Sequence, residues 1–229
     1  YILMENINVT KGKVFVIPQG NRSGSTTGML GNAYPKFFHV PTSFGEKTLR
    51  IGDRGTNPLD QWPDPFTFVH YPSRQNLAYQ DIRNMNRTYP GRENGTLTER
   101  ASYAIMELIR KENIDLSIDV HEASIMYPVV ATYVAHERSF DIAMMAAMML
   151  TATSFDMKCE SSPKGLRGLS HREWGDFSDT LAVLMETPEP FIDRVVGPMT
   201  EELFTEGKDE FLATAAEHGL TYVPYNLEF

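Results

Sequence analysis

The chain has 229 residues, of which 41% are hydrophobic and 22% charged, and its formal net charge is −9. This composition is typical of a globular protein with one substantial core, and the acidic balance argues against nucleic-acid partners, because no basic stripe can neutralise phosphates. The sequence has no apolar run of about 20 residues and no signal peptide, so a soluble protein without membrane contact is expected.

Cys159 is the single cysteine, so no disulfide can form within the chain. This favours a reducing, cytoplasmic compartment, although export stays open. The chain also lacks a GxSxG elbow and the Lys-Ser/Thr of a phosphate-binding loop. These patterns argue against a serine hydrolase and against a P-loop nucleotide site.

The N-terminal third is expected to be mostly irregular. The first residues read like the end of a helix, and residues 13–18, "KVFVIP", are an apolar run stopped by proline that predicts a buried strand. The stretch at about 19–85 is rich in Gly, Pro, Ser and Asp. It predicts a long excursion, either a surface loop with short strands or a substrate lid.

Regular elements are expected from Thr96 onward. Thr96 and Glu99 have the spacing of a capping box and open an amphipathic helix with an apolar face that includes Leu97, Ala104 and Ile109. The remaining predicted elements are strands at 115–121, 129–134 and 180–188 and helices at about 137–151 and 199–220.

Four methionines fall at helical spacing in the helix predicted at 137–151, namely Met144, Met145, Met148 and Met149. They are interpreted as core filler, because the flexible thioether suits irregular gaps in a core. The alternation of strands and helices predicts a single α/β domain with a mixed central sheet flanked by helices.

Two of the predicted strands end on residues suited to catalysis. The first ends in "IDVHE", which places His121 two residues after Asp119, and the second, "TLAVLME", ends on Glu186. Ligands bind at the carboxyl ends of strands in open α/β sheets, and an imidazole oriented by a carboxylate is a common zinc ligand. The alternatives are a buried His121 satisfied by hydrogen bonds and a Glu186 that caps the turn at Pro188.

A third motif precedes the capped helix, where residues 86–91 read "NRTYPG". The ordered set "NRTYPG", "IDVHEA" and "VLMETPE" resembles the succinylglutamate desuccinylase/aspartoacylase branch of the zinc carboxypeptidase superfamily. The resemblance implies a zinc carboxypeptidase-like α/β/α sandwich. It also implies a Zn²⁺-dependent hydrolase that cleaves an amide bond in a small-molecule or peptide substrate bearing a carboxylate.

The resemblance assigns roles to the matched residues. His121 would be the third zinc ligand, Glu186 the general base, and Asn86 and Arg87 the clamp for the substrate carboxylate. A planar guanidinium suits that clamp because it can bind a carboxylate bidentately. The alternative for Arg87 is a surface salt bridge of little energetic value.

The chain departs from the family pattern in two places. The family takes its first two zinc ligands from an HxxE motif upstream of the strand at 13–18, and residues 1–20 contain no HxxE, so the chain is expected to be N-terminally incomplete. Aspartoacylase members carry an arginine seven residues before the Asn-Arg pair, where this chain has Tyr79, with Arg83 nearer. An arginine shortly before the catalytic glutamate is also usual, and Arg172 or Arg167 would fill that substrate-binding position.

Deacylation of an N-acyl amino acid and removal of a C-terminal amino acid both fit the same set of residues. The rival interpretation is a binding or scaffold module that keeps the fold without the metal site. If the chain holds zinc tightly by itself, Glu122, His171 and Glu173 are the candidates for further ligands. Either function is compatible with a homo-oligomer.

Overall fold

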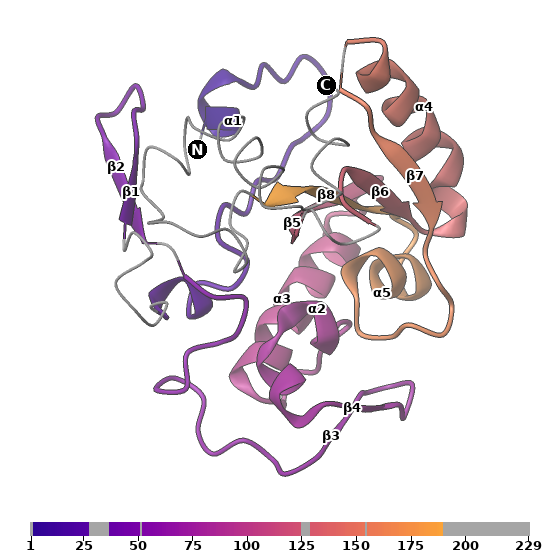
Figure 1. The fold of residues 1–229 in the computed structure, drawn as a ribbon. Coiled ribbons are helices and arrows are strands. Elements are labelled where there is room, and N and C mark those ends of the chain that lie inside the picture. Colours follow the sequence, from indigo (N-terminus) through magenta and orange to yellow (C-terminus); the bar gives the residue numbers. More distant parts are fainter. Residues whose placement is uncertain (1, 28–36, 51, 125–128, 154, 190–229) are drawn as a thin grey trace, which may run out of the picture.

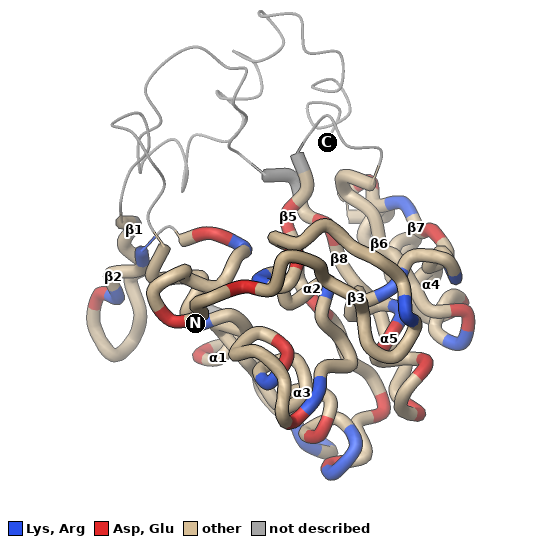
Figure 2. Tube along the Cα trace, turned by 90° about the horizontal axis from the view of Figure 1, so that it is seen from below, with Lys and Arg blue, Asp and Glu red and all other residues tan. Residues whose placement is uncertain are grey.

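The computed structural model describes residues 2–27, 37–50, 52–124, 129–153 and 155–189. Helices flank a mixed parallel and antiparallel sheet, so the predicted α/β class is confirmed (Figure 1). Lys and Arg are interspersed with Asp and Glu along the described trace (Figure 2). In this part of the chain, no helix has the length and apolar character needed to cross a membrane.

The central sheet has four strands in the order β5-β8-β6-β7. They are β5 (Leu116–Ser124), β8 (Leu181–Glu189), β6 (Thr132–Ala135) and β7 (Lys158–Ser161). β5 runs parallel to β8 and β6 parallel to β7, whereas β6 and β8 are antiparallel. β8 therefore lies inside the sheet, and its residues Ala182, Val183 and Leu184 are buried.

Helices cover both faces of this sheet, because successive strand residues point to opposite faces. On the face of Ala182 lie α2 (Met85–Thr88), α3 (Leu97–Lys111) and α5 (Ser170–Phe177). On the face of Val183 lies α4 (Phe140–Thr151), which follows the short turn η3 (Glu137–Ser139). The two faces thus have separate hydrophobic clusters.

α3 begins as predicted, with a capping box in which Thr96 accepts from the Glu99 backbone and Glu99 accepts from the Thr96 backbone. Its predicted apolar face is partly wrong, since Leu97 and Ala104 are exposed. Thr98 and Ser102 are buried there with Met106 and Ile109. Hydrogen bonds explain this burial, because the hydroxyls of Thr98 and Ser102 both have buried side-chain partners.

Within the predicted excursion at about 19–85, the described residues are mostly irregular, with short strands. Two small hairpins lie within it, as do two short 3₁₀ turns. In chain order the N-terminal elements are α1 (Ile2–Asn6), η1 (Gly24–Thr26), β1 (Phe37–Val40), β2 (Lys47–Arg50), β3 (Phe68–Val69), β4 (Asn76–Leu77) and η2 (Tyr79–Arg83).

The strand predicted at 13–18 is wrong, because these residues form a loop. Val14, Phe15 and Ile17 are exposed, and a strand exists only where a partner supplies hydrogen bonds. β7 and α5 were not predicted, and the helix expected at 199–220 lies outside the described residues.

The interpretation of the α4 methionines as core filler is wrong for three of the four. Met145, Met148 and Met149 are exposed, whereas Met144 is half-buried. The side of α4 that contacts the sheet carries small residues instead, with Ala143 and Ala147 buried in the cluster. Small side chains let the helix lie close to β6 and β7, and this leaves the longer methionines on the outer side.

Candidate active site at the carboxyl ends of two parallel strands

β5 and β8 bring His121 and Glu186 together in their carboxyl-terminal halves. The prediction that the strands end on these two residues is wrong, because both strands continue for three more paired residues. The strands are parallel, and His121 is the register partner of Glu186. Because side chains alternate along a strand, Asp119, His121 and Glu186 share the face of Ala182, the face covered by α3 and α5. Two residues separated by 65 positions thus become neighbours on one face of the sheet.

Asp119 holds the imidazole of His121 in a defined orientation. The ring Nε2 lies 2.9 Å from Asp119 Oδ2, which leaves Nδ1 as the second ring nitrogen. Burial opposes the positive charge of the ring, but the hydrogen bond and charge of Asp119, with the charge of Glu186, outweigh burial and raise the pKa of His121. The surroundings of His121 therefore favour a positive charge at this position.

Glu186 carries a buried carboxylate oxygen. Its Oε2 has no hydrogen-bond partner among the described residues. Burial raises the pKa of Glu186, the positive charge of His121 opposes this, and the negative charges of Asp119 and Glu122 add to it. An unpartnered oxygen does not fit the alternative of a turn cap, whereas a partly desolvated carboxylate suits proton transfer.

Arg87 lies on α2, close to these groups. Its positive charge opposes the rise in the pKa of His121 and adds slightly to the lowering of the pKa of His171, so the guanidinium lies within electrostatic range of both rings. Its Nη1 donates to the backbone oxygen of Asn86 at 2.7 Å. No described carboxylate forms an ion pair with it, so the alternative of a surface salt bridge has no support in the described residues.

Asn86 connects α2 to α5. Its Oδ1 accepts a hydrogen bond from the backbone N–H of Ser170 at 2.8 Å, at the first residue of that helix. Because Oδ1 is occupied by this hydrogen bond, Asn86 would contact a substrate through its side-chain amide nitrogen. The side chain also has a positioning role, because it fixes the start of α5 against α2.

His171 is a buried neighbour of the site that the resemblance did not assign. Its Nδ1 lies 2.7 Å from Ser162 Oγ. Burial and the positive charges of Arg172 and His121 lower the pKa of His171 to about 3, so the ring is neutral at physiological pH. The sequence signal was slight, since α5 carries "SHREWGDF" with no apolar stripe.

Gly168, in the loop before α5, lies against the backbone of Arg87. Its φ is +84°, and a Cβ at this position would lie 2.2 Å from the backbone oxygen of Arg87. The backbone N–H of Tyr89 donates to Gly168 O at 3.2 Å. Only glycine permits both the left-handed conformation and this approach.

Gly168→Ala is therefore expected to lower the free energy of unfolding by about 1–3 kcal/mol and to displace Arg87. Denaturant unfolding measures the first effect. Gly165→Ala in the same loop is the control, because a Cβ there meets no atom within 4 Å. Equal stability of the two variants would contradict the close contact with Arg87.

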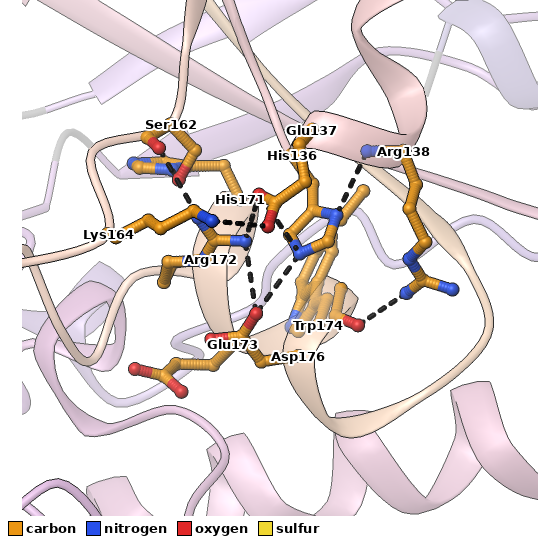
Figure 3. A network of polar contacts seen from close by, with 12 residues as sticks. His136, Glu137, Arg138, Ser162, Lys164, His171, Arg172, Glu173, Trp174 and Asp176 are labelled. Carbon is orange, nitrogen blue, oxygen red and sulfur yellow. Dashed lines mark hydrogen bonds and ion pairs between the residues drawn. The ribbon is translucent and has the colours of Figure 1, made fainter.

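Arg172 does not lie among the site residues. The side chain is 1% exposed, and its guanidinium donates to Glu137 at 2.6 Å, to Asp176 at 3.0 Å and to the backbone oxygen of Ser162 at 3.3 Å (Figure 3). These contacts give Arg172 a structural role, and the prediction that it binds substrate has no support in them. Arg167 is likewise paired, with Glu173 and Asp176.

The described residues fit only part of a zinc site. They contain no group of three His, Cys, Asp or Glu side chains arranged to hold a metal ion. His121 can supply one nitrogen, and the unpartnered oxygen of Glu186 lies beside it. Glu173, named as a further ligand, instead accepts from Arg167 and from the Gly168 backbone. Any other ligands would come from outside the described residues.

A cavity of about 250 Å³ lies elsewhere, between the β3–β4 hairpin, α3 and the end of α5. Its lining includes Tyr71, Tyr103 and Phe177, with Arg92 and Arg110, and none of the predicted site residues. Both arginines are paired with glutamates of α3. Of the charged residues that line the cavity, Arg92 and Arg110 are thus already paired, and Glu93 is exposed. None of the residues singled out by the sequence motifs lies there, so the site on β5 and β8 is the stronger candidate.

Comparisons of the chain with protein-family models, with curated proteins and with solved structures found no match.

Proposed function

We propose that the chain belongs to a zinc-dependent hydrolase that cleaves an amide bond in a small carboxylate-bearing substrate. The observation that supports the proposal most directly is the pairing of His121 with Glu186 in register, in the carboxyl-terminal halves of two parallel strands. A nitrogen ligand and a buried, unpartnered carboxylate thus stand side by side, with the guanidinium of Arg87 close by. The ordered motifs of the sequence support the same family.

In this proposal His121 holds the zinc through the ring nitrogen that Asp119 leaves free. Asp119 orients the ring by its 2.9 Å contact, as carboxylates commonly do for metal-binding histidines. When bound, zinc would act as a Lewis acid that polarises the scissile carbonyl and lowers the pKa of a water molecule. The remaining ligands lie outside the described residues.

Glu186 performs the proton transfers. Its carboxylate takes a proton from the water that attacks the acyl carbon, and it delivers that proton to the nitrogen as the C–N bond breaks. The products are a carboxylic acid and an amine, so no other reactant is needed. The raised pKa of Glu186 brings it nearer to working pH and suits both steps.

Arg87 binds the substrate carboxylate. Arg87→Lys should raise KM and lower kcat/KM by about 10-fold or more, because an ammonium group cannot make the two parallel hydrogen bonds of a guanidinium. Steady-state kinetics with carboxylate substrates and their amides measure the effect. The amides should lose a similar factor with the native enzyme, and exposed Arg100→Lys on α3 is the control. Equal turnover of acid and amide substrates would refute the assignment.

One observation favours a second candidate function. The described residues lack a three-ligand metal group, which fits a binding or scaffold module of the same fold. Such a module would bind a carboxylate ligand through Arg87 without hydrolysing it. The two functions differ in metal content and in turnover.

The deciding experiment combines metal analysis with an amine-release assay. The protein is incubated with N-acyl amino acids and with short peptides, with and without added zinc, and free amine is measured. We expect release that depends on about one zinc per chain and stops with a chelator. Carboxylate binding without zinc and without amine release would establish the binding module instead. Tight binding of zinc by the 229-residue chain alone would show that further zinc ligands lie within this chain.

A further inference from the structure

The outer side of α4 and the segment after it expose several large apolar side chains. Five large side chains between 36% and 72% exposed form it, and we refer to them as the α4 stripe: Ile142, Met145, Met148, Met149 and Phe155. The four helical members fall within one side of α4, at intervals of three, four and seven residues. The opposite side of the helix packs on the sheet through Ala143 and Ala147.

This composition is unusual for a helix with a solvent-facing side. No charged residue occurs between Asp141 and Asp156, so the stripe lacks the polar residues that normally cover such a side. A helix that is apolar on all sides is usually buried on all sides. Contiguous exposed apolar patches on soluble proteins mark interaction surfaces, and methionine is common on them.

We propose that the α4 stripe is the contact surface of a symmetric dimer of this chain. With side chains of about 200 Å² each, the exposed fractions amount to about 600 Å² per copy. Two facing stripes would bury about 1,200 Å² in total, which reaches the lower limit of a specific, stable interface. A twofold axis lets one patch cover itself, so no second surface is required.

The charge distribution within the α4 stripe permits contact with a second copy. Each copy carries a net charge of −9, so two copies repel each other wherever their acidic surfaces meet. The stripe lies within residues 142–155, a stretch of 14 residues without charge, so it can contact its own copy without juxtaposing like charges. An antiparallel arrangement of the two helices also sets opposite ends of their dipoles side by side, which is favourable.

Sedimentation equilibrium of the full chain tests the dimer. Met149→Glu should raise the dissociation constant by about 100-fold or more, because two carboxylates would face each other near the axis. Met149→Lys should do the same, and an equimolar mixture of the two variants should dimerise again. Phe66→Glu is the control, since Phe66 is fully exposed and lies far from α4 in the sequence.

Methionine oxidation tests the native chain without substitution. Hydrogen peroxide should oxidise Met145, Met148 and Met149 more slowly as protein concentration rises, whereas exposed Met4 on α1 should keep its rate. A chain that stays monomeric up to about 0.1 mM would overturn the proposal, because interfaces of standard size bind at micromolar concentration or below. A dimer that Met149→Glu leaves intact, or stripe oxidation independent of concentration, would overturn it equally.

Discussion

Glu186→Gln is expected to lower turnover by about 100-fold or more, the usual scale for the loss of a general base. The amide keeps the shape of the side chain but cannot accept the proton of the attacking water. Zinc content and KM should stay near their native values, because Glu186 is assigned neither to the metal nor to the substrate carboxylate. Single-turnover kinetics with the zinc-loaded protein measure the chemical step directly.

Glu160→Gln is the matched control for this substitution. Glu160 is an exposed glutamate of β7, which lies at the opposite edge of the same sheet from β5. Its loss should leave turnover unchanged. Native turnover in Glu186→Gln would show that the base lies elsewhere, and loss of zinc in that variant would show that Glu186 is a ligand.

The same substitution should stabilise the protein at neutral pH. Folding raises the pKa of Glu186, so the ionised form is less favourable in the folded chain than in the unfolded chain. The resulting loss of stability begins as pH rises through the unfolded pKa of about 4.3 and is complete above the folded pKa. Glu186→Gln should therefore unfold at a higher temperature than native protein at pH 7, with no such gain near pH 3. A variant less stable than native protein at pH 7 would contradict the desolvated carboxylate.

Sequence patterns were sufficient to predict those helices and strands whose formation depends on contacts within one segment of the chain. The capping box at Thr96 and the apolar runs of β5 and β8 each lie within one segment, and these elements were predicted. α5 was missed because its buried residues include Arg172 and Glu173, which pair with side chains from other parts of the structure. The run at 13–18 looks like a strand, but no described segment pairs with it.

In the candidate site, individual residues could be predicted from the sequence, but the contacts between them could not. His121 and Glu186 could be named because each follows an apolar run, but their pairing depends on strand order, which no local pattern contains. The contacts of Asn86 with Ser170 and of Gly168 with Arg87 join segments about 80 residues apart. The burial and pairing of Arg172 could not be predicted, because motif spacing carries no information on the acids around a guanidinium.

Arg172→Met is expected to cause the largest loss of stability in the described part of the chain. The guanidinium lies between Glu137 and Asp176, and Asp176 also contacts His136 (Figure 3). Arg167 is a further partner of Asp176. Methionine fills similar space but leaves both carboxylates without this partner. Removal of one partner from a buried ion pair costs about 3–5 kcal/mol. The lower value is expected because Glu137 is half-exposed and can be rehydrated.

Denaturant unfolding of Arg172→Met at several pH values separates the ion pair from simple loss of packing. The hydrogen bond with Arg172 lowers the pKa of Glu137 to about 2, so Glu137 stabilises native protein above the unfolded pKa and loses this effect as pH falls toward 2. The stability difference between native protein and variant should therefore be largest at neutral pH and should shrink in acid. Arg100→Met, on the exposed side of α3, should change stability by less than about 0.5 kcal/mol at every pH. A difference that does not vary with pH would mean that Arg172 acts through packing alone, and the pairing with Glu137 would then contribute nothing to the fold.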